Sequence, residues 1–367
     1  MTPLIVVLFI VGLAVLVAGG ELLVRGASRL AVAAGISPLV VGLTVVAFGT
    51  SAPELAVSVM AAIGGQADLA LGNVVGSNIS NILLILGLSA LFAPLVVNQQ
   101  LIRLDVPLMI AVSLLLFLFA RNGMVSTLEG VLLFVGVVAY TAFAIRQSRS
   151  ESRQVQSEYE QEFGAVGGAA TGKVTMPRDI SLVVLGIVLL NIGAKFLVDS
   201  AVEIAEHFGV SELVIGLTIV AVGTSLPELA TSVVAAIRGE RDIAVGNVVG
   251  SNLFNILCVV GMTAIVVPEG LRVAPGALSF DIPVMIAVSV AALPIFFNGY
   301  RIERWEGGLF LFYYVAYVLY VILAAAHHDA LALYSAMMFW FVIPLTVLTL
   351  GVVTLRAVRR QIPPGTG

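Results

Sequence analysis

The feature that most limits how this chain can fold is a long stretch of sequence that occurs twice. Residues 42–65 read GLTVVAFGTSAPELAVSVMAAIGG, and residues 216–239 read GLTIVAVGTSLPELATSVVAAIRG. A second pair follows at the same offset of 174 residues, ALGNVVGSNISNILLILGLSAL at 70–91 and AVGNVVGSNLFNILCVVGMTAI at 244–265. Shared motifs of this length indicate duplication rather than chance similarity between apolar segments. We therefore expect two related halves.

Composition places both halves in a membrane. Hydrophobic residues make up 60% of the 367 residues and charged residues 11%, against roughly 25% charged residues in a soluble domain. Apolar runs of about 20 residues, long enough to cross a bilayer, recur along the chain. We predict an all-α integral membrane protein with eleven spans, at about 4–28, 38–63, 69–91, 105–120, 127–145, 180–204, 212–237, 243–266, 280–297, 306–325 and 331–355.

The number of spans per half predicts how the halves are related. Five is odd, so the second half enters the membrane from the opposite side, and we predict two inverted-topology repeats, which are typical of secondary transporters. Of the 18 Lys and Arg residues, fifteen fall on the side of the central linker, Arg121 and Arg272 fall on the other side, and Lys195 lies within a span. Since positive charge accumulates in the cytoplasm, we predict a multi-pass protein of the cell membrane with its N-terminus outside and its linker and C-terminus inside. The N-terminus lacks the basic start of a signal peptide and is expected to remain as the first span.

Four segments follow from this pattern. Residues 1–145 form the first five-helix repeat, 146–179 a polar cytoplasmic linker, 180–326 the second repeat, and 327–367 an additional helix and tail. The last span has no counterpart in the first half, so we expect it to pack at the periphery. The acidic residues of the linker lack the spacing of an EF-hand loop, and we predict a solvated segment.

Each copy of the GTSxPE motif places one carboxylate, Glu54 or Glu228, inside an apolar half. Such a carboxylate is costly unless it is paired, and no Lys or Arg in either motif could pair with it. Two facing carboxylates would neutralise one divalent cation. Pro53 and Pro227 lack an N–H and follow a glycine by four residues, so each helix is expected to break just before the glutamate and free a carbonyl oxygen.

Polar residues at helical spacing add further oxygen atoms around each glutamate. Hydroxyl groups precede the glutamates by four and three residues, and three polar residues at intervals of four line the next helix. These residues are Thr50, Ser51, Asn73, Ser77 and Asn81 in the first half and Thr224, Ser225, Asn247, Ser251 and Asn255 in the second. Without imidazole or thiolate groups, the set favours Ca²⁺, Mg²⁺, Mn²⁺ or Na⁺ over zinc or copper.

The remaining features predict structural roles. Asp105 and Asp281 sit beside proline at expected helix starts, and Glu129 and Glu306 precede glycine near helix starts, so we predict that all four cap helices. The single cysteine offers no disulfide framework. Because the sequence has no nucleophile–base pair, nucleotide loop, cofactor motif or basic aromatic patch, we predict no enzyme activity, no cofactor and no nucleic-acid partner.

The two copies of GTSxPE, each followed by GNVVGSNxxNIL, resemble the alpha repeats of the cation/calcium exchanger superfamily, and the prokaryotic sodium/calcium exchangers in particular, over residues 1 to about 325. The resemblance implies ten core helices in two inverted halves, with the first and sixth helices sliding over a fixed ligand core. It implies a Ca²⁺ site formed by Glu54 and Glu228 with backbone carbonyls of Thr50 and Thr224. It implies flanking Na⁺ sites at the carbonyls of Ala47 and Ala221 and the side chains of Ser51, Ser77, Ser225 and Ser251. It also implies that the amide side chain of Asn81 lines the centre.

One position departs from that pattern. Some sodium/calcium exchangers have aspartate where this chain has Asn255, so the centre is expected to hold two acidic groups rather than three. We predict an antiporter that exchanges Na⁺ for Ca²⁺ by alternating access at a midplane site, within the lipid bilayer and without an obligatory protein partner. An H⁺/Ca²⁺ antiporter is the alternative, because each glutamate could take a proton. A cation channel fits less well with inverted repeats and a midplane dense in ligands.

Overall fold

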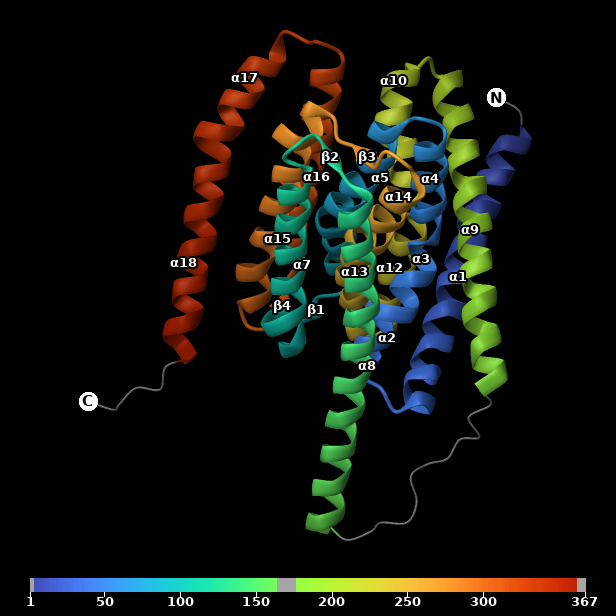
Figure 1. Cartoon of the computed structure of the whole chain (residues 1–367), viewed down its shortest axis with the longest axis vertical. Helices are drawn as coiled ribbons and strands as arrows, with labels where there is room; N and C mark the ends of the chain where they lie inside the picture. The colour runs from blue at the N-terminus through green and yellow to red at the C-terminus, as the bar shows by residue number, and fades with distance from the viewer. Residues whose placement is uncertain (1–2, 164–175, 362–367) are drawn as a thin grey trace.

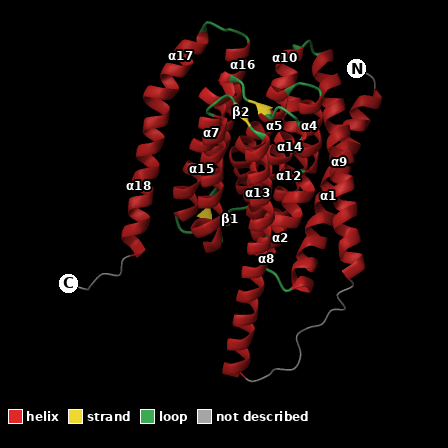
Figure 2. Ribbon diagram, viewed as in Figure 1, coloured by secondary structure: helices red, strands yellow, loops and turns green. Residues whose placement is uncertain are grey.

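The structure is a computed structural model that describes residues 3–163 and 176–361, almost all of them helical (Figure 2). The first half contains α1 (Pro3–Ala34), α2 (Pro38–Val41), η1 (Gly42–Val46), α3 (Ala47–Thr50), α4 (Ala52–Ile63), α5 (Ala67–Ser80), η2 (Asn81–Leu86), α6 (Gly87–Phe92), β1 (Leu95–Val96), η3 (Leu101–Asp105), α7 (Val106–Ala120), β2 (Met124–Val125) and α8 (Thr127–Phe163), where η marks a π-helical segment.

The second half repeats this order of elements. It contains α9 (Met176–His207), α10 (Glu212–Ile215), η4 (Gly216–Val220), α11 (Ala221–Gly223), α12 (Leu226–Arg238), α13 (Arg241–Phe254), η5 (Asn255–Val260), α14 (Gly261–Val266), β3 (Leu271–Arg272), η6 (Ala277–Asp281), α15 (Ile282–Phe297), β4 (Arg301–Ile302) and α16 (Arg304–Ala325). The appended segment consists of α17 (Ala330–Met337), η7 (Met338–Val342) and α18 (Ile343–Gln361).

The described residues include nine helices long and apolar enough to cross a membrane. A tenth span is formed by the pair Pro38–Thr50 and Ala52–Ile63, which bends by 44° at its break. The remaining predicted span, at 212–237, is divided among α10, η4, α11 and α12. Helices therefore occupy all eleven predicted regions, and those that carry the repeated glutamates are the interrupted ones.

The long helices α1 and α9 lie side by side and run in opposite directions, α1 downward from the N-terminus and α9 upward from the lower end (Figure 1). Glycines allow their backbones to touch. A Cβ atom built on Gly19 would lie 2.6 Å from the backbone nitrogen of Leu190, and one on Gly193 would lie 2.5 Å from that of Leu16. Small residues at helix crossings allow this close approach in membranes.

Two short antiparallel strand pairs join the halves. β1 pairs with β4, with Leu95 opposite Ile302, and β2 pairs with β3, with Met124 opposite Arg272. The first pair lies near the lower end of the bundle and the second near its upper end (Figure 1). Each half thus contributes one strand to each pair.

The centre of the bundle is formed by the repeated GNVVGSN helices. Leu71, Val75 and Ile79 on α5 and Ala244 and Val248 on α13 are at most 1% exposed. These helices continue into the π-helical segments η2 and η5, which begin at Asn81 and Asn255. A π-helical segment shifts the helical register locally and is often found at functional sites.

Two parts of the chain outside the repeats bear on the predicted segments. Helix α8 continues to Phe163, so the first part of the predicted linker 146–179 is helical rather than loop. Residues 164–175 lie outside the described residues, and no side-chain position is described for the acidic residues at 151–162. The appended α17–α18 stands at one edge of the bundle (Figure 1), and no residue of Ala330–Val352 is buried.

Candidate functional site

Two interrupted helices bring Glu54 and Glu228 into the core. α3 ends at Thr50 and α4 begins at Ala52, and Ser51 between them has φ −85° and ψ 6°. In the second half, Ser225 precedes α12 with φ −87° and ψ 4°. The proline that follows lies in the first turn of each new helix, where its missing N–H leaves no bond unmade. The predicted break is confirmed, and each glutamate lies in a first turn, where the helix dipole favours negative charge.

Each central carboxylate accepts a hydrogen bond from a serine of the opposite half. Ser225 Oγ donates to Glu54 Oε1 at 3.3 Å, and Ser51 Oγ donates to Glu228 Oε1 at 2.9 Å. Ser77 Oγ also donates to Glu54 Oε1, at 3.4 Å. Both glutamates are 0% exposed. The two motif copies therefore form one joint centre rather than two separate ones.

Several buried oxygen atoms in this centre accept no hydrogen bond from any residue that the structure describes. They are Oε2 of Glu54, Oε2 of Glu228, Oδ1 of Asn81, Oδ1 of Asn255 and Oγ of Ser251. None of the described ion pairs involves either glutamate. Buried oxygens are almost always satisfied in folded proteins, so a group of unsatisfied oxygens around two carboxylates indicates a ligand that is an electron-pair acceptor.

The chemistry of these atoms restricts that ligand. All are hard oxygen donors, which suit Ca²⁺, Mg²⁺ and Na⁺. The described residues contain no cluster of three or more His, Cys, Asp or Glu side chains that could hold a metal ion. The centre thus carries two acidic groups, with the amide of Asn255 beside them rather than a third carboxylate.

The threonines and the first asparagines form a symmetric layer around the glutamates. Thr50 Oγ1 donates to Asn247 Oδ1 at 3.1 Å, and Thr224 Oγ1 donates to Asn73 Oδ1 at 3.2 Å. The amide of Asn73 donates in turn to the backbone oxygen of Glu54 at 3.4 Å. Asn73 and Asn247 belonged to the predicted polar stripe, and their contacts show that they position the broken helices.

Sequence reasoning missed a second pair of asparagines, Asn78 and Asn252. The amide of Asn78 donates to the backbone oxygen of Asn252 at 3.3 Å, and that of Asn252 donates to the backbone oxygen of Asn78 at 3.4 Å. Asn81 Nδ2 donates to Asn252 Oδ1 at 2.9 Å, and Asn255 Nδ2 donates to Asn78 Oδ1 at 3.0 Å. The signal was the GSN triplet present in both copies, whose asparagine follows a predicted ligand by one residue.

Hydrogen bonds link nine of the twelve predicted site residues, directly or through the neighbouring asparagines: Glu54, Glu228, Thr50, Thr224, Ser51, Ser225, Ser77, Asn81 and Asn255. A tenth, Ser251, is buried on α13. The remaining two, Ala47 and Ala221, differ from each other. Ala47 is buried, and its carbonyl accepts bonds from Ser51 N at 2.9 Å and Thr50 Oγ1 at 3.4 Å. Ala221 is exposed.

The capping prediction was wrong for the two aspartates and is confirmed for the two glutamates. Asp105 makes no side-chain cap and instead accepts a bond from Tyr140 Oη at 3.0 Å, and Asp281 accepts one from Tyr317 Oη at 3.3 Å. A tyrosine of another helix thus donates to each aspartate in place of the local backbone N–H groups. Glu129 accepts a bond from Ser126 N at 2.7 Å, and Glu306 completes a capping box with Glu303.

The site is closed toward the lower end of Figure 1. There the interrupted span α2–η1 packs on α13. A Cβ atom on Gly250 would lie 2.6 Å from the backbone oxygen of Leu43, and one on Gly246 would lie 2.9 Å from that of Leu39. The two helices are therefore in backbone contact at these glycines, and no side chain larger than a hydrogen atom fits there.

The equivalent positions toward the upper end are open. A Cβ atom on Gly72, Gly76 or Gly216 would meet nothing within 4 Å, although these glycines correspond to Gly246, Gly250 and Gly42 at the 174-residue offset. Thr224 and Asn73 are half-buried, whereas Thr50 is 1% exposed and Asn247 is 0% exposed. Among the described residues, the glycine contact on α13 is therefore closed and the equivalent positions on α5 are open.

Comparison with known proteins shows the family of this chain. The sodium/calcium exchanger protein family matches residues 4–146 and 179–323. The chain belongs to this family. Relatives include the putative antiporter CaxA of Alkalimonas amylolytica, 40% identical over 84% of this chain and 95% of that protein, and the sodium/calcium exchanger MaX1 of Methanosarcina acetivorans, 36% identical over 85% of this chain and 96% of that protein.

A solved structure shares the fold. The sodium-calcium exchanger NCX_Mj superposes with a TM-score of 0.72 at 30% identity, over 86% of this chain and 98% of that one. The inner membrane protein YrbG of Escherichia coli (strain K12) is 40% identical over 77% of this chain and 86% of its own. This chain is thus a multi-pass membrane protein of a cation/Ca²⁺ antiporter family. The matched residues end at 323, before the appended α17–α18.

Proposed function

We propose that this protein exchanges Na⁺ for Ca²⁺ across the cell membrane, at one shared site between Glu54 and Glu228. The observation that carries the proposal is the group of buried oxygens without hydrogen-bond donors around these two carboxylates. Two negative charges balance one Ca²⁺. Removing such charges from water without a partner is strongly unfavourable, so the two buried carboxylates favour binding of a cation.

Sharing of ligands gives the coupling. Ser51 and Ser225 donate to the opposite glutamate in the structure, yet a hydroxyl oxygen can also turn a lone pair toward a cation. Na⁺ and Ca²⁺ both take oxygen ligands, so ions in the flanking positions compete for the carboxylates that hold Ca²⁺. The two ions therefore bind in exchange for each other rather than together.

Access alternates through the two glycine contacts. We infer that the upper end faces the outside, because the positively charged residues gather at the lower end, as the positive-inside pattern requires. In this orientation the outer glycine contact is the open one and the inner contact is the closed one. Because the repeats are inverted, the opposite state forms when each half adopts the conformation that the other half has now. In that state α10–η4 would pack on α5 at Gly72 and Gly76, and the contact at Gly246 and Gly250 would open.

An H⁺/Ca²⁺ antiporter is the second candidate, favoured by one observation. The centre has Asn255 in place of a third acidic group, so two glutamates that each take one proton would exchange electroneutrally for one Ca²⁺. Both candidates use the same carboxylates and differ in the driving ion.

The test separates the site from the driving ion. Purified protein in liposomes is assayed for uptake of radioactive Ca²⁺ in two sets, one loaded with Na⁺ at equal pH and one sodium-free and acidic inside. We expect uptake in the sodium-loaded set only. Uptake driven by the pH gradient alone would assign the chain to the proton-coupled candidate.

Variants test the carboxylates directly. Glu54→Gln and Glu228→Gln are expected to abolish Ca²⁺ uptake in the sodium-loaded set and to lose the rise in unfolding temperature that Ca²⁺ gives the wild type, since ligand binding stabilises only a competent site. Glu269→Gln, whose side chain is 77% exposed and remote from the centre, is the matched control. Near-normal uptake by either glutamine variant would contradict the proposed site.

A further inference from the structure

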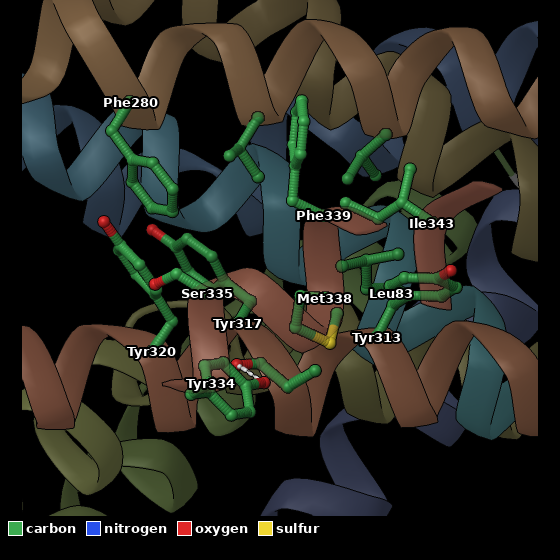
Figure 3. Close-up of a pocket in the computed structure, with 13 residues that line it drawn as sticks. Leu83, Phe280, Tyr313, Tyr317, Tyr320, Tyr334, Ser335, Met338, Phe339 and Ile343 are labelled. Atoms are coloured by element: carbon green, nitrogen blue, oxygen red, sulfur yellow. Dashed lines mark hydrogen bonds between the residues drawn. The ribbon is translucent and has the colours of Figure 1, made fainter. Parts of the chain in front are cut away.

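The appended helix and the core enclose a cavity of about 410 Å³ that the exchange mechanism does not use. Its walls come from α15, α16 and the segment α17–η7–α18, with Leu83 of η2 at its floor (Figure 3). This volume falls in the range of sites that hold small organic ligands, roughly 300–1,000 Å³.

Hydrogen bonds of Tyr334 and Tyr313 attach the appended helix to the core, and the helix stands off the core between these two tyrosines. Near its upper part, Tyr334 Oη donates to the backbone oxygen of Ala316 at 2.8 Å. Lower down, Tyr313 Oη donates to Thr346 Oγ1 at 2.6 Å. No residue of Ala330–Val352 is buried, so side-chain packing does not close the space between the two bonds.

The position of the cavity restricts its occupant to something apolar. All of its walls belong to membrane-spanning segments, namely Ala67–Phe92, Ala277–Phe297, Arg304–Ala325 and Ala330–Val352. Hydrocarbon surrounds these segments, and an empty gap would leave its lining without dispersion contacts. We propose that the cavity binds one acyl chain of a membrane phospholipid.

The lining also orients this chain. Tyr320 and Ser335 lie at one end, next to Phe280, whereas Leu83, Met338, Ile343 and Tyr313 lie toward the other end (Figure 3). The hydroxyl of Tyr313 already donates to Thr346 Oγ1, whereas that of Tyr320 has no hydrogen-bond partner among the described residues. Phe280 stacks on Tyr320 with ring centroids 4.1 Å apart and fixes its ring. The ester of the lipid lies at the Tyr320 end, where a tyrosine hydroxyl can donate to its carbonyl, and the acyl chain runs toward Ile343.

This cavity borders the helical segment that carries Asn81 of the ion centre. Leu83 follows Asn81 by two residues on the same π-helical segment, and it is 4% exposed. The bound chain therefore packs against the helix that contributes Asn81 to the centre. Among the described residues, no helix equivalent to α17–α18 covers α7 and α8 of the first half.

The test uses a phospholipid with a photoreactive acyl chain, incorporated into liposomes with the full-length protein, and maps the labelled residues by mass spectrometry. We expect labels on Tyr320, Tyr334 and Met338. Met338→Trp fills the cavity and should reduce this labelling several-fold. Met337→Trp is the matched control, because Met337 is 57% exposed, does not line the cavity, and is the neighbouring residue of the same type.

A second pair of variants changes residues of α15, on the core side of the cavity. Val288 lines the cavity, and Val290 on the same helix is 46% exposed to lipid, so Val288→Trp should reduce labelling and Val290→Trp should not. This pair keeps the test decisive if a substitution on α17–α18 detaches that segment. Equal labelling in wild type, Met338→Trp and Val288→Trp would overturn the proposal. So would wild-type labelling of the cavity no stronger than that of Phe312, which is 51% exposed on α16.

Discussion

At the scale of single residues, the centre depends on exchange of partners between the two motif copies. The serine of each GTSxPE motif donates to the glutamate of the other copy, at 2.9 Å for Ser51 and 3.3 Å for Ser225. A hydroxyl is suited to this position because it donates to a carboxylate in one state and offers a lone pair to a cation in another. Alanine at this position would provide neither the hydrogen-bond donor nor the lone pair.

The serines can be tested individually. Ser51→Ala and Ser225→Ala are each expected to raise the KM for Ca²⁺ by roughly ten-fold or more, because a hydrogen bond to a charged group contributes about 1.5–3 kcal/mol. The measurement is Na⁺-driven Ca²⁺ uptake in liposomes over a range of Ca²⁺ concentrations. Ser113→Ala is the control, since this buried serine donates to Met109 O within its own helix. An unchanged KM in both variants would show that the exchanged bonds do not serve binding.

The grouping of these residues could be predicted because its signals are local. Glu54, Ser51 and Thr50 share one helical face at fixed spacing, so their grouping follows from periodicity alone. Asn78 and Asn252 could not be assigned in this way, because their partners are backbone oxygens of the opposite half. The aspartate caps failed for the same reason, as Tyr140 and Tyr317 approach from other helices.

At the scale of elements, proline and glycine predicted where the helices break, but no local pattern could predict which glycine contact is closed. The segments at 42–50 and 216–224 have nearly the same sequence, yet η1 packs on α13 while η4 leaves α5 uncovered. If the two equivalent contacts close in alternation, as proposed, the conformational state is a property of the whole bundle. Each glycine is therefore compatible with both environments.

This alternation predicts unequal effects of equivalent substitutions. Gly76→Ala places its methyl group in open space, so the unfolding temperature should not fall, but the closed upper contact would then be obstructed and exchange should slow several-fold. Gly250→Ala forces η1 away from α13 and should favour the opposite state. The measurement for both is the rate of Ca²⁺ exchange, together with modification of a cysteine at position 221 by a membrane-impermeant reagent. The native Cys258 is buried and should not interfere.

Controls separate obstruction from a general effect of adding a methyl group to a helix. Gly308→Ala on α16 also enters open space but lies away from both contacts, so its exchange rate should match the wild type. We expect modification at position 221 to be faster in Gly76→Ala than in Gly250→Ala. Equal rates in the two variants would contradict alternating closure at these glycines.

At the scale of the whole molecule, the halves meet along two kinds of surface. The central helices interlock through asparagine bonds, whereas α1 and α9 touch backbone to backbone at glycines spaced seven residues apart, Gly12 and Gly19 on one helix and Gly186 and Gly193 on the other. We propose that these two closely packed helices move together as one body over the ligand core. Glu21 on α1 forms an ion pair with Arg238 on α12 at 2.7 Å, which ties this body to one side in the present state. An exposed pair of this kind contributes little stability and is easily exchanged.

The appended helix lies outside this machinery, and its removal is the final prediction. A chain that ends after His328 loses the bonds of Tyr313 to Thr346 and of Tyr334 to Ala316 O, each a net contribution of about 1 kcal/mol, but no buried residue of Ala330–Val352. The family match also ends at residue 323. We therefore expect the shortened chain to fold, to keep Na⁺-driven Ca²⁺ uptake within a few-fold of the wild type, and to lose acyl-chain labelling at Tyr320. Tyr313→Phe in the full chain, which removes one attachment and keeps the helix, separates loss of a bond from loss of the cavity wall. Complete loss of uptake by a shortened chain that still folds would show that the eleventh helix takes part in exchange itself.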